Sequence, residues 1–438
     1  MAGEAALIGR YRAYPEYRPS EIESTTEMPV HWIAGKVKYV TESLDRIRVP
    51  LSAEERGARK GEYPYYGASG IIDYVDDYLF DEETILFGED GANLIARSSP
   101  LAFLAKGKYW VNNHAHILRT KDGVNDYWVM CLENIDVTTV VSGSAQPKLT
   151  AEALGDLNIV YPPTISERKK IANFLDHETA KIDTLIDKQQ QLITLLKEKR
   201  QAVISHAVTK GLTPHAPMRD SGVEWLGEVP EHWDVCRLKQ TIKSGSSISY
   251  GIVQPGEPLE EGVAFVQTTN MSKGTFDLVN LQKTTKEIAK AYPRSTLVGG
   301  EVILGIRASI GAAFVVPESL RGCNLSRGVA RIIPSEHMSS EYLVAYFGTG
   351  AVERYWGLSK QGSTFSEVSI ETVRELSLPV PPVEEQKQIA KWIDERITRL
   401  DDVFQRAMEQ TVLLNERRTA LISAAVTGKI DVRNWKAA

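Results

Sequence analysis

One stretch of the sequence occurs twice, and this repeat constrains the fold more than any other feature. Residues 167–208 align without a gap on residues 385–426, with a constant offset of 218. In both copies mostly apolar residues recur at alternating steps of four and three, the spacing of the contact seam in a two-stranded coiled coil. Each copy therefore predicts one long helix. The predicted seam consists of Ile171, Leu175, Glu178, Ile182, Leu185, Gln189, Leu192, Leu196, Lys199, Val203 and His206, and of Ile389, Ile393, Arg396, Leu400, Val403, Ala407, Gln410, Leu414, Arg417, Leu421 and Ala424.

Proline and glycine mark the ends of both predicted helices. A diproline precedes each copy, at 162–163 and at 381–382, and a glycine follows each copy within a few residues. Proline stops the preceding strand and suits a helix start, while glycine suits a helix stop. At about 1.5 Å per residue, each helix spans roughly 60 Å. We expect the two helices to pack antiparallel as a rigid spacer.

A second, shorter repeat precedes the first in each half. Residues 18–38 align on residues 219–239 with an offset of 201. The whole chain is therefore a tandem duplication with a pseudo-two-fold axis. The shared residues are Arg18, Ser20, Glu23, Glu27, Pro29, His31, Trp32 and Lys38, which recur as Arg219, Ser221, Glu224, Glu228, Pro230, His232, Trp233 and Lys239.

Between the repeats, each half contains a poorly shared region with short strand-like runs separated by turn residues. We predict an α+β fold with two strand-rich domains joined by two long antiparallel helices that form a coiled coil. The predicted parts are a first domain at 1–160, a first spacer helix at 161–211, a second domain at 212–380, and a second spacer helix with a C-terminal tail at 381–438.

Composition excludes some classes of protein. With 42% hydrophobic and 25% charged residues, the 438-residue chain is typical of a globular protein of two or three domains. We find no apolar run long enough to span a membrane and no signal peptide, so we expect a cytoplasmic location. The isolated cysteines Cys131, Cys236 and Cys323 indicate neither a disulfide framework nor a zinc module. The net charge of −6 lacks the basic excess of most nucleic-acid-binding proteins.

The sequence contains no recognisable catalytic motif. We find no phosphate-binding glycine loop, no HExxH or GxSxG motif and no paired Cys/His ligands. His114 and His116 have a spacing that would let them share a metal ion, but turn or interface histidines explain them more simply. The acidic clusters at 76–77 and 81–83 are better explained as a solvated, charged surface than as catalytic residues. The chain itself is predicted to be non-catalytic and to bind no cofactor or metal.

These features together resemble the specificity subunit of type I restriction-modification enzymes. The resemblance rests on the duplicated Pro-x-His-Trp segment and on the diproline followed by the repeated helix, and it covers nearly the whole chain. One departure is Glu167-Arg168, which replaces the Glu-Gln retained at 385–386.

The resemblance implies two target-recognition domains, each reading one half of a bipartite site in double-stranded DNA. It also implies that the helices dock two modification (methyltransferase) subunits, and that restriction (motor and nuclease) subunits join the complex. S-adenosylmethionine, ATP and Mg are then expected in those partner subunits.

Base readout needs side chains that donate or accept hydrogen bonds from loops entering a groove. Strand-end and turn positions of both variable regions carry such residues. The predicted DNA-binding residues are Lys60, Tyr65, Tyr66, Ser69, Arg97, Asn112 and His114 in the first domain, and Gln267, Asn270, Arg307, Ser309, Asn324, Ser326 and Arg327 in the second.

Two alternatives remain open from the sequence. The first is a coiled-coil structural adaptor without DNA readout, which the divergence of the two variable regions beside well-preserved helices disfavours. The second is an enzyme with an unrecognised site, which the missing motifs disfavour.

Overall fold

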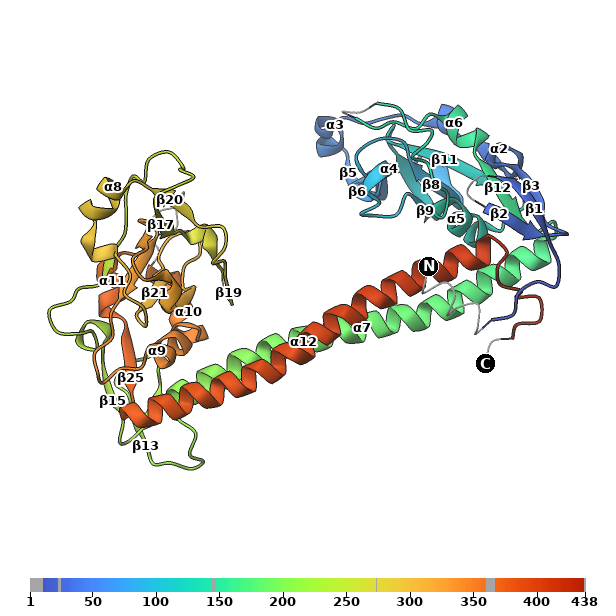
Figure 1. The fold of residues 1–438 in the computed structure, drawn as a ribbon. Helices are drawn as coiled ribbons and strands as arrows, with labels where there is room; N and C mark the ends of the chain where they lie inside the picture. The colour runs from blue at the N-terminus through green and yellow to red at the C-terminus, as the bar shows by residue number, and fades with distance from the viewer. Residues whose placement is uncertain (1–10, 23–24, 144–145, 273, 360–366, 437–438) are drawn as a thin grey trace. The chain divides into compact units, whose positions relative to one another are not determined.

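The computed structural model describes residues 11–22, 25–143, 146–272, 274–359 and 367–436. It divides into two compact units (Figure 1). Unit 1 comprises Met1–Gln190 and Glu409–Ala438, and unit 2 comprises Gln191–Met408. Glu23, one of the residues shared by the short repeat, lies outside the described residues. Each unit consists of a strand-rich globule and part of each long helix, while the four-part division drawn from the sequence stays a prediction.

Both predicted long helices are present, as α7 (Ile165–Lys210) and α12 (Val383–Val426). Each begins within two residues of its diproline. Proline has no N–H, and an N–H at the start of a helix would have no intrahelical partner. Thr164 stabilises the start of α7 because its Oγ1 accepts the N–H of Glu167 at 3.2 Å. The 46 residues of α7 correspond to a length of about 69 Å.

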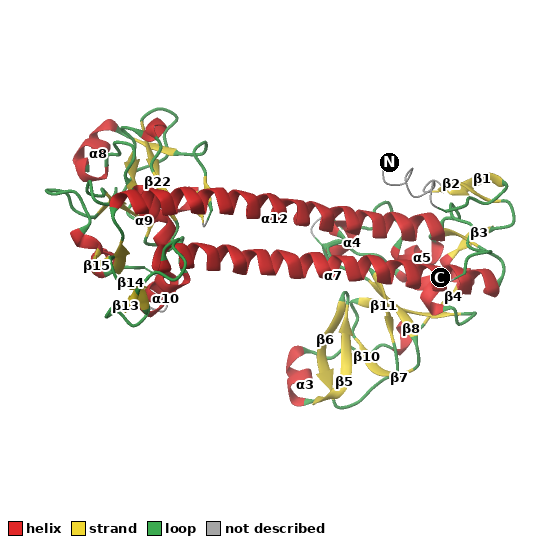
Figure 2. Ribbon diagram, turned by 90° about the horizontal axis from the view of Figure 1, so that it is seen from below, coloured by secondary structure: helices red, strands yellow, loops and turns green. Residues whose placement is uncertain are grey.

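The two helices pair antiparallel, and the pairing is reciprocal. In unit 1, Arg418 Nε of α12 lies 2.8 Å from Asp183 Oδ1 of α7. In unit 2, Arg200 Nε of α7 lies 3.4 Å from Asp401 Oδ1 of α12. The aspartates are equivalent positions of the repeat, and so are the arginines. The same two repeat positions therefore join the helices in each unit, and Figures 1 and 2 show the helices side by side within each unit.

The predicted coiled-coil seam is correct near the start of α7 and at both ends of α12, where Ile389, Leu421 and Ala424 are buried, and it is wrong at several positions of α7. Ile171, Leu175 and Ile182 are buried, but Leu185 is 46% exposed. Near the end of α7 the buried positions are Ile204, Ala207 and Val208 rather than the predicted Val203 and His206. An unsupercoiled helix has 3.6 residues per turn, so its buried face drifts away from a strict 3.5-residue repeat.

The globule of unit 1 is built on two four-stranded sheets. Their strand orders are β4-β11-β8-β9 and β6-β5-β10-β7. The strands of these sheets are β4 (Thr41–Ser43), β5 (Lys60–Gly67), β6 (Gly70–Val75), β7 (Phe80–Asp81), β8 (Thr84–Gly88), β9 (Ala102–Ala105), β10 (Lys108–Val111) and β11 (Ala115–Thr120). Two antiparallel pairs complete the strands, namely β1 (Tyr17–Ile22) with β2 (Thr25–Pro29) and β3 (Ile33–Lys36) with β12 (Asn158–Tyr161). The short helices are α2 (Val37–Val40), α3 (Ala53–Ala58), α4 (Asn93–Ala96), α5 (Asn125–Glu133) and α6 (Ala151–Asp156).

The globule of unit 2 repeats this topology. Its sheets have the orders β16-β24-β21-β22 and β20-β17-β23, with the pairs β15-β25, β13-β14 and β18-β19 beside them. The strands are β13 (Met218–Asp220), β14 (Glu228–Pro230), β15 (Asp234–Arg237), β16 (Ser249–Tyr250), β17 (Val263–Val266), β18 (Met271–Ser272), β19 (Thr275–Phe276), β20 (Gln282–Thr284), β21 (Val302–Gly305), β22 (Ala313–Val315), β23 (Asn324–Leu325), β24 (Val329–Ile332) and β25 (Ser377–Val380). The short helices are α8 (Lys286–Ala291), α9 (Ser340–Phe347), α10 (Gly350–Ser359) and α11 (Ile370–Glu375). The predicted α+β duplication is therefore confirmed.

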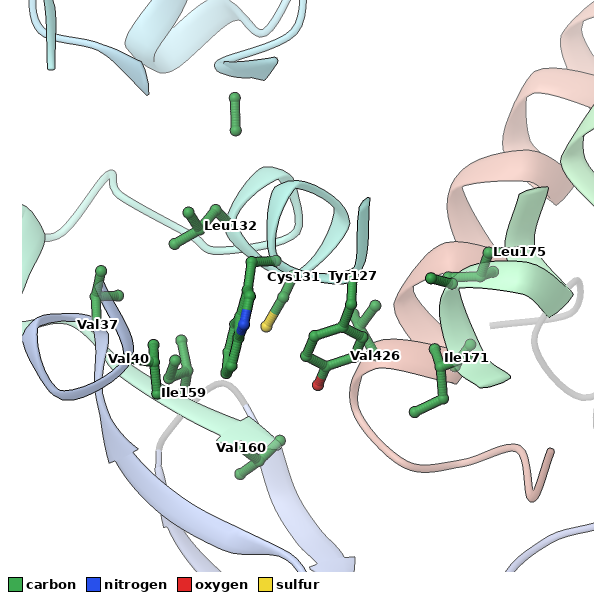
Figure 3. Packing of buried hydrophobic residues seen from close by; sticks show 14 of the residues in the cluster. Val37, Val40, Tyr127, Cys131, Leu132, Ile159, Val160, Ile171, Leu175 and Val426 are labelled. Atoms are coloured by element: carbon green, nitrogen blue, oxygen red, sulfur yellow. The ribbon is translucent and has the colours of Figure 1, made fainter. Parts of the chain in front are cut away.

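Each globule shares one apolar core with the adjoining part of the helix pair. In unit 1, Tyr127 of α5 belongs to the same buried cluster as Ile171 of α7 and Val426 of α12 (Figure 3). In unit 2, Tyr342 of α9 takes the corresponding place, and its hydroxyl donates to the carbonyl of Val208 at 3.0 Å. Burial of aromatic side chains of this size is worth several kcal/mol to each unit, on the order of 2–3 per ring.

The Pro-x-His-Trp segment packs against the start of one long helix and the end of the other. Trp32 Nε1 donates to Glu167 Oε1 at 3.2 Å, and a Cβ atom at Gly428 would lie 3.2 Å from the Trp32 ring. We call Trp32, His31 and Glu167 the first tryptophan cluster. Gly428 has a φ of 81°, so this position requires glycine both for its backbone conformation and for the close approach.

The same arrangement recurs in unit 2. Trp233 Nε1 donates to Glu385 Oε1 at 3.2 Å, and a Cβ atom at Gly211, whose φ is 73°, would lie 3.2 Å from the Trp233 ring. We call Trp233, His232 and Glu385 the second tryptophan cluster. The shared segment thus serves to join each globule to the helix ends.

Within the described residues, none of the helices combines the length and the apolar character needed to cross a membrane. The three cysteines are free, and Cys131 is buried in the unit 1 core.

Candidate nucleic-acid interface

Several strand ends converge at the same place in both globules. The parallel strands β5 and β10 pair Tyr66 with Val111, and β17 and β23 pair Val266 with Leu325. Because the carboxyl ends of parallel strands meet at one edge, the loops that follow them lie together. The ends of β8 and β21 join this edge, since each pairs with the strand that follows β10 or β23.

In unit 1 this edge brings together four of the predicted DNA-binding residues. The Asn112 N–H donates to the Tyr66 carbonyl at 3.0 Å, and Asn112 Oδ1 accepts the N–H of His114 at 2.8 Å. His114 Nδ1 lies 2.7 Å from Asp90 Oδ2, and its side chain is 46% exposed. Ser69 occupies the exposed turn between β5 and β6, next to this group. Asn112 is only 6% exposed and holds the loop in place, so the exposed part of this edge is formed mainly by Ser69 and His114.

Three other predictions in unit 1 fall elsewhere. Tyr65 is fully buried and its hydroxyl accepts the N–H of Leu51, so the prediction that it contacts DNA is wrong. Lys60 lies at the opposite end of β5 and pairs with Asp73 at 2.6 Å. Arg97 donates to the carbonyls of Glu133 and Ile135, which end helix α5.

In unit 2 the equivalent edge gathers five of the predicted residues. Arg307 and Arg327 both lie beside Glu367, while Gln267, Ser309 and Ser326 lie on the neighbouring loops. Ser309 Oγ donates to the carbonyl of Thr268 at 3.0 Å, which ties the loop after β21 to the loop after β17. Two guanidinium groups around one carboxylate leave this edge positively charged.

Asn270 and Asn324 are structural residues, and their prediction as DNA contacts is wrong. Asn270 is 6% exposed, and its amide bonds the backbone of Gln267 and Asn280. Asn324 is 1% exposed, and its Nδ2 donates to Ser295 Oγ at 2.9 Å. Buried amides satisfied in this way are held in place and cannot reach a base edge.

The sequence analysis missed three charged residues at these edges. Asp90 forms an isolated β-bridge with Lys148, and Arg307 forms one with Glu367. Asp90, Lys148 and Glu367 were not predicted, because the sequence offers no local signal that brings 90 near 148 or 307 near 367. A comparison of strand ends between the two globules would have found them.

Beside the unit 1 edge lies a buried charge network. Ligand-type atoms of Asp45, Glu89 and His116 lie within 4.8 Å of one another, which is a spacing suited to a metal ion. However, Arg48 Nη1 lies 2.6 Å from Glu89 and supplies the positive charge. Both nitrogens of His116 face acceptors, Asp45 Oδ2 at 2.6 Å and the Leu149 carbonyl at 2.9 Å. Because both ring nitrogens are engaged by protein acceptors, neither nitrogen of His116 is free to bind a metal ion.

The network shifts the acid–base behaviour of its carboxyls. Burial by itself raises the pKa of Asp45, but hydrogen bonds from His116 and the Ile117 N–H outweigh it, so the net pKa lies below its ordinary value. Burial likewise raises the pKa of Glu89, and the hydrogen bond from Arg48 with the charge of His116 brings it below its ordinary value. Both carboxyls are therefore ionised at neutral pH and fix the loop that carries Asp90.

Unit 2 also contains a cavity of about 940 Å³ between α7, α9 and α12. Its apolar wall includes Ile204, Phe314 and Trp356, and charged residues such as Lys391 and Asp394 also line it. Trp356 Nε1 is buried and has no hydrogen-bond partner in the part of the chain that the structure describes. None of the predicted DNA-binding residues lines this cavity, so it is separate from the candidate interface.

Comparisons with known proteins identify the family. The model for the type I restriction modification DNA specificity domain matches residues 29–195 and again residues 230–405. The chain therefore belongs to the family of type I restriction-modification specificity subunits. The two matches coincide with the two halves of the duplication.

Curated relatives are similar along much of the chain. The specificity subunit of the type I restriction enzyme EcoBI from Escherichia coli is 26% identical over 294 residues, which cover 66% of this chain and 61% of that subunit. The MjaVIII specificity subunit of Methanocaldococcus jannaschii is 21% identical over 425 residues, covering 93% of this chain and 95% of that one.

Two solved structures share the fold. One is a chain from a structure on the assembly and conformational transition of the type I restriction-modification system, with a TM-score of 0.68 at 15% identity over 92% of this chain and 99% of that one. The other is the HsdS subunit from Thermoanaerobacter tengcongensis, with a TM-score of 0.51 at 16% identity over 92% of this chain and 98% of that one.

Proposed function

We propose that this specificity subunit reads a bipartite site in double-stranded DNA, with each globule recognising one half. The observation that carries the proposal is the duplicated candidate interface. In both units polar and charged side chains gather at the same strand ends, while the sequences of those ends differ. Two equivalent surfaces with different side chains suit two half-sites with different bases.

We further propose that the paired helices dock two modification subunits. Apolar side chains near the middle of the helix pair are exposed in both units. In unit 1 these include Leu185 (46%) and Leu413 (54%), and in unit 2 they include Val403 (43%) and Leu195 (60%). Each unit 1 residue is the repeat equivalent of one in unit 2. Exposed apolar groups in clusters favour protein partners, and two equivalent faces favour two copies of one partner.

In this proposal the chain itself is non-catalytic. The modification subunits use S-adenosylmethionine to methylate adenine, and restriction subunits use ATP and Mg to move along DNA and cut it. The role of this chain is to place those activities at one sequence. A coiled-coil adaptor without DNA readout remains the second candidate, because the exposed helix faces would serve it equally well.

The decisive experiment maps methylated bases in DNA from cells that express this chain with its modification subunit. The expected result is adenine methylation at one bipartite motif. Exchanging residues 40–150 for the matching region of a relative should then change one half of the motif only. Methylation without any sequence motif would favour the adaptor.

The helices should also set the distance between the half-sites. Inserting four residues into α7 after Gln190 and four into α12 before Glu409 adds about one turn, or about 6 Å, to both members of the pair. Since DNA rises about 3.4 Å per base pair along one strand, the half-sites should move apart by one or two base pairs. Methylation only at the original spacing would exclude this role.

A further inference from the structure

The two units carry opposite charges at one equivalent position. Asp90 follows the end of β8 by two residues, and Arg307 follows the end of the equivalent strand β21 by two residues. Each forms an isolated backbone β-bridge with a residue that lies two positions before a helix N-cap. These residues are Lys148, before Thr150, and Glu367, before Ser369. The acid and the base have therefore exchanged places between the units.

The Arg307 side chain retains unused donors. Its Nη2 lies 2.9 Å from Glu367 Oε2, while its Nε is buried and has no hydrogen-bond partner among the described residues. Arg327 Nη2 lies 4.0 Å from the same carboxylate oxygen. The two arginine side chains are 38% and 47% exposed. Glu367 thus orients the Arg307 guanidinium group but does not bond to all of its N–H donors. The one negative charge of Glu367 faces the two positive charges of Arg307 and Arg327.

The backbone around Arg307 is held firmly. Ala308 has a φ of 55°, a conformation that non-glycine residues rarely adopt and that is kept only where neighbours impose it. The Ile306 N–H donates to the Gly328 carbonyl at 2.9 Å, and the Val368 N–H donates to the Ile306 carbonyl at 2.9 Å. The Arg307 side chain is therefore attached to a rigid backbone, which reduces the entropy cost of forming a specific contact.

From this geometry we infer that Arg307, oriented by Glu367, recognises a guanine in the half-site read by unit 2. The inference rests on the proposed DNA-reading function. A guanidinium fork matches the O6 and N7 acceptors that guanine presents in the major groove. At the equivalent position of unit 1, the Asp90 carboxylate would repel those two acceptors. The two half-sites therefore differ at this position, with guanine on the unit 2 side.

The test uses the full chain assembled with its modification subunit. Arg307→Gln and Arg307→Lys are compared with the wild type by methylation mapping and by binding to cognate and scrambled duplexes. Arg321→Gln is the matched control, because Arg321 is also an exposed arginine of unit 2 beside one glutamate, Glu318. Unfolding curves establish that each variant is folded.

Arg307→Gln should weaken cognate binding roughly 10- to 100-fold, and methylation should spread to sites with other bases at one guanine position. Arg307→Lys, which keeps the charge but loses the fork, should relax the same position. Glu367→Gln should relax it less, because Glu367 only orients the guanidinium. The other half-site and the Arg321→Gln control should be unchanged.

Two outcomes would overturn the inference. A phosphate contact would make Arg307→Gln weaken cognate and scrambled binding equally, with an unchanged motif and with Arg307→Lys close to wild type. An unchanged motif and affinity would exclude any DNA contact by Arg307. Failure of the proposed function itself is recognised separately, because the wild-type complex would then show no bipartite motif.

Discussion

Units 1 and 2 share their scaffolds and differ at their exposed strand ends. Both use a four-stranded sheet of the same order, a parallel strand pair, and a tryptophan cluster at the helix ends. Beside the candidate interface, Asp90 and Lys148 of unit 1 correspond to Arg307 and Glu367 of unit 2 with the charges reversed. Both contacts are backbone β-bridges, which do not depend on the charge of the side chains, so the acid and the base can be exchanged without loss of the bridge. The surface can therefore change its chemistry while the scaffold is retained.

The start of each long helix shows the opposite behaviour. Arg168 and Gln386 are different residues at one repeat position, yet both donate to the carbonyl five residues earlier, Pro163 at 3.1 Å and Pro381 at 2.8 Å. Here the contact is kept although the residue type changes. The residues at the helix ends are therefore constrained by contacts within the fold. The charges at the strand ends are constrained by a factor other than the folding of the chain.

The largest expected effect concerns the buried tryptophans. Trp32→Ala should lower the free energy of unfolding of unit 1 by about 3–5 kcal/mol, and Trp233→Ala should do the same in unit 2, because each ring is 1% exposed. Amide hydrogen exchange during denaturant unfolding assigns each loss to a unit. Trp435→Ala, at a partly buried ring of unit 1, serves as the control and should cost less. Equal loss of protection in both units from either change would contradict independent clusters.

The glutamates of the two clusters should differ in importance. Glu167 is 6% exposed and accepts from Trp32, His31 and Tyr14, whereas Glu385 is more exposed and accepts from Trp233 and His232. Glu167→Ala leaves buried donors without an acceptor and should cost about 3 kcal/mol, against about 1–2 for Glu385→Ala. Denaturant titrations of the two variants measure the difference. A larger loss for Glu385→Ala would break this ranking.

Acid should weaken unit 1 before unit 2. The lowered pKa values of Asp45 and Glu89 mean that these carboxyls stay ionised in the folded unit while the unfolded chain binds protons near pH 4. Their stabilisation, on the order of 1 kcal/mol, is present above about pH 4 and lost as the pH falls through the lowered values. In unit 2, Glu318 also has a lowered pKa, chiefly through its hydrogen bond from Arg321, but it is exposed and solvent screens it.

Unfolding monitored by hydrogen exchange at pH 6 and pH 3 tests this expectation. Asp45→Asn removes the titrating group, so the variant should be less stable than wild type at pH 6 and should lose less on acidification. If unit 2 lost more stability than unit 1 at pH 3, the network would not be the acid-sensitive part of the chain.

The smallest effects are expected at the reciprocal ion pairs of the helices. Arg418→Ala in unit 1 and Arg200→Ala in unit 2 should each cost about 0.2–1 kcal/mol, because both arginines are 41% exposed. Double-mutant cycles with Asp183→Ala and Asp401→Ala measure the two coupling energies. The 2.8 Å pair should couple more strongly than the 3.4 Å pair, and a coupling in only one of them would break the pseudo-two-fold relation.

Much of the scaffold could be predicted from the sequence because the chain repeats itself. Two gapless repeats located both helices and showed that the two halves share one topology. The seam register was less predictable, because the sequence does not reveal whether a helix supercoils. Leu185 fits a heptad and yet is 46% exposed.

The candidate interface was predictable only in part. Turn chemistry pointed to His114 and Arg307 correctly as exposed residues at strand ends. It could not separate Asn324, which supports a buried turn, from a side chain that faces solvent. The bridge between Asp90 and Lys148 joins residues far apart in sequence, and no local pattern encodes it.

Unit 1 is discontinuous in the chain, and this has a consequence for its biosynthesis. Its first and last segments meet through bonds such as the Tyr17 hydroxyl to the Gly428 carbonyl, across 411 residues, and the Asp431 N–H to the Arg12 carbonyl. The ribosome makes all of unit 2 between them, which takes roughly 10–45 s at about 5–20 residues per second. Unit 2 is complete in itself and can fold during that interval. Unit 1 begins to form first but can close only after unit 2 has been made, because Trp32 packs against Gly428.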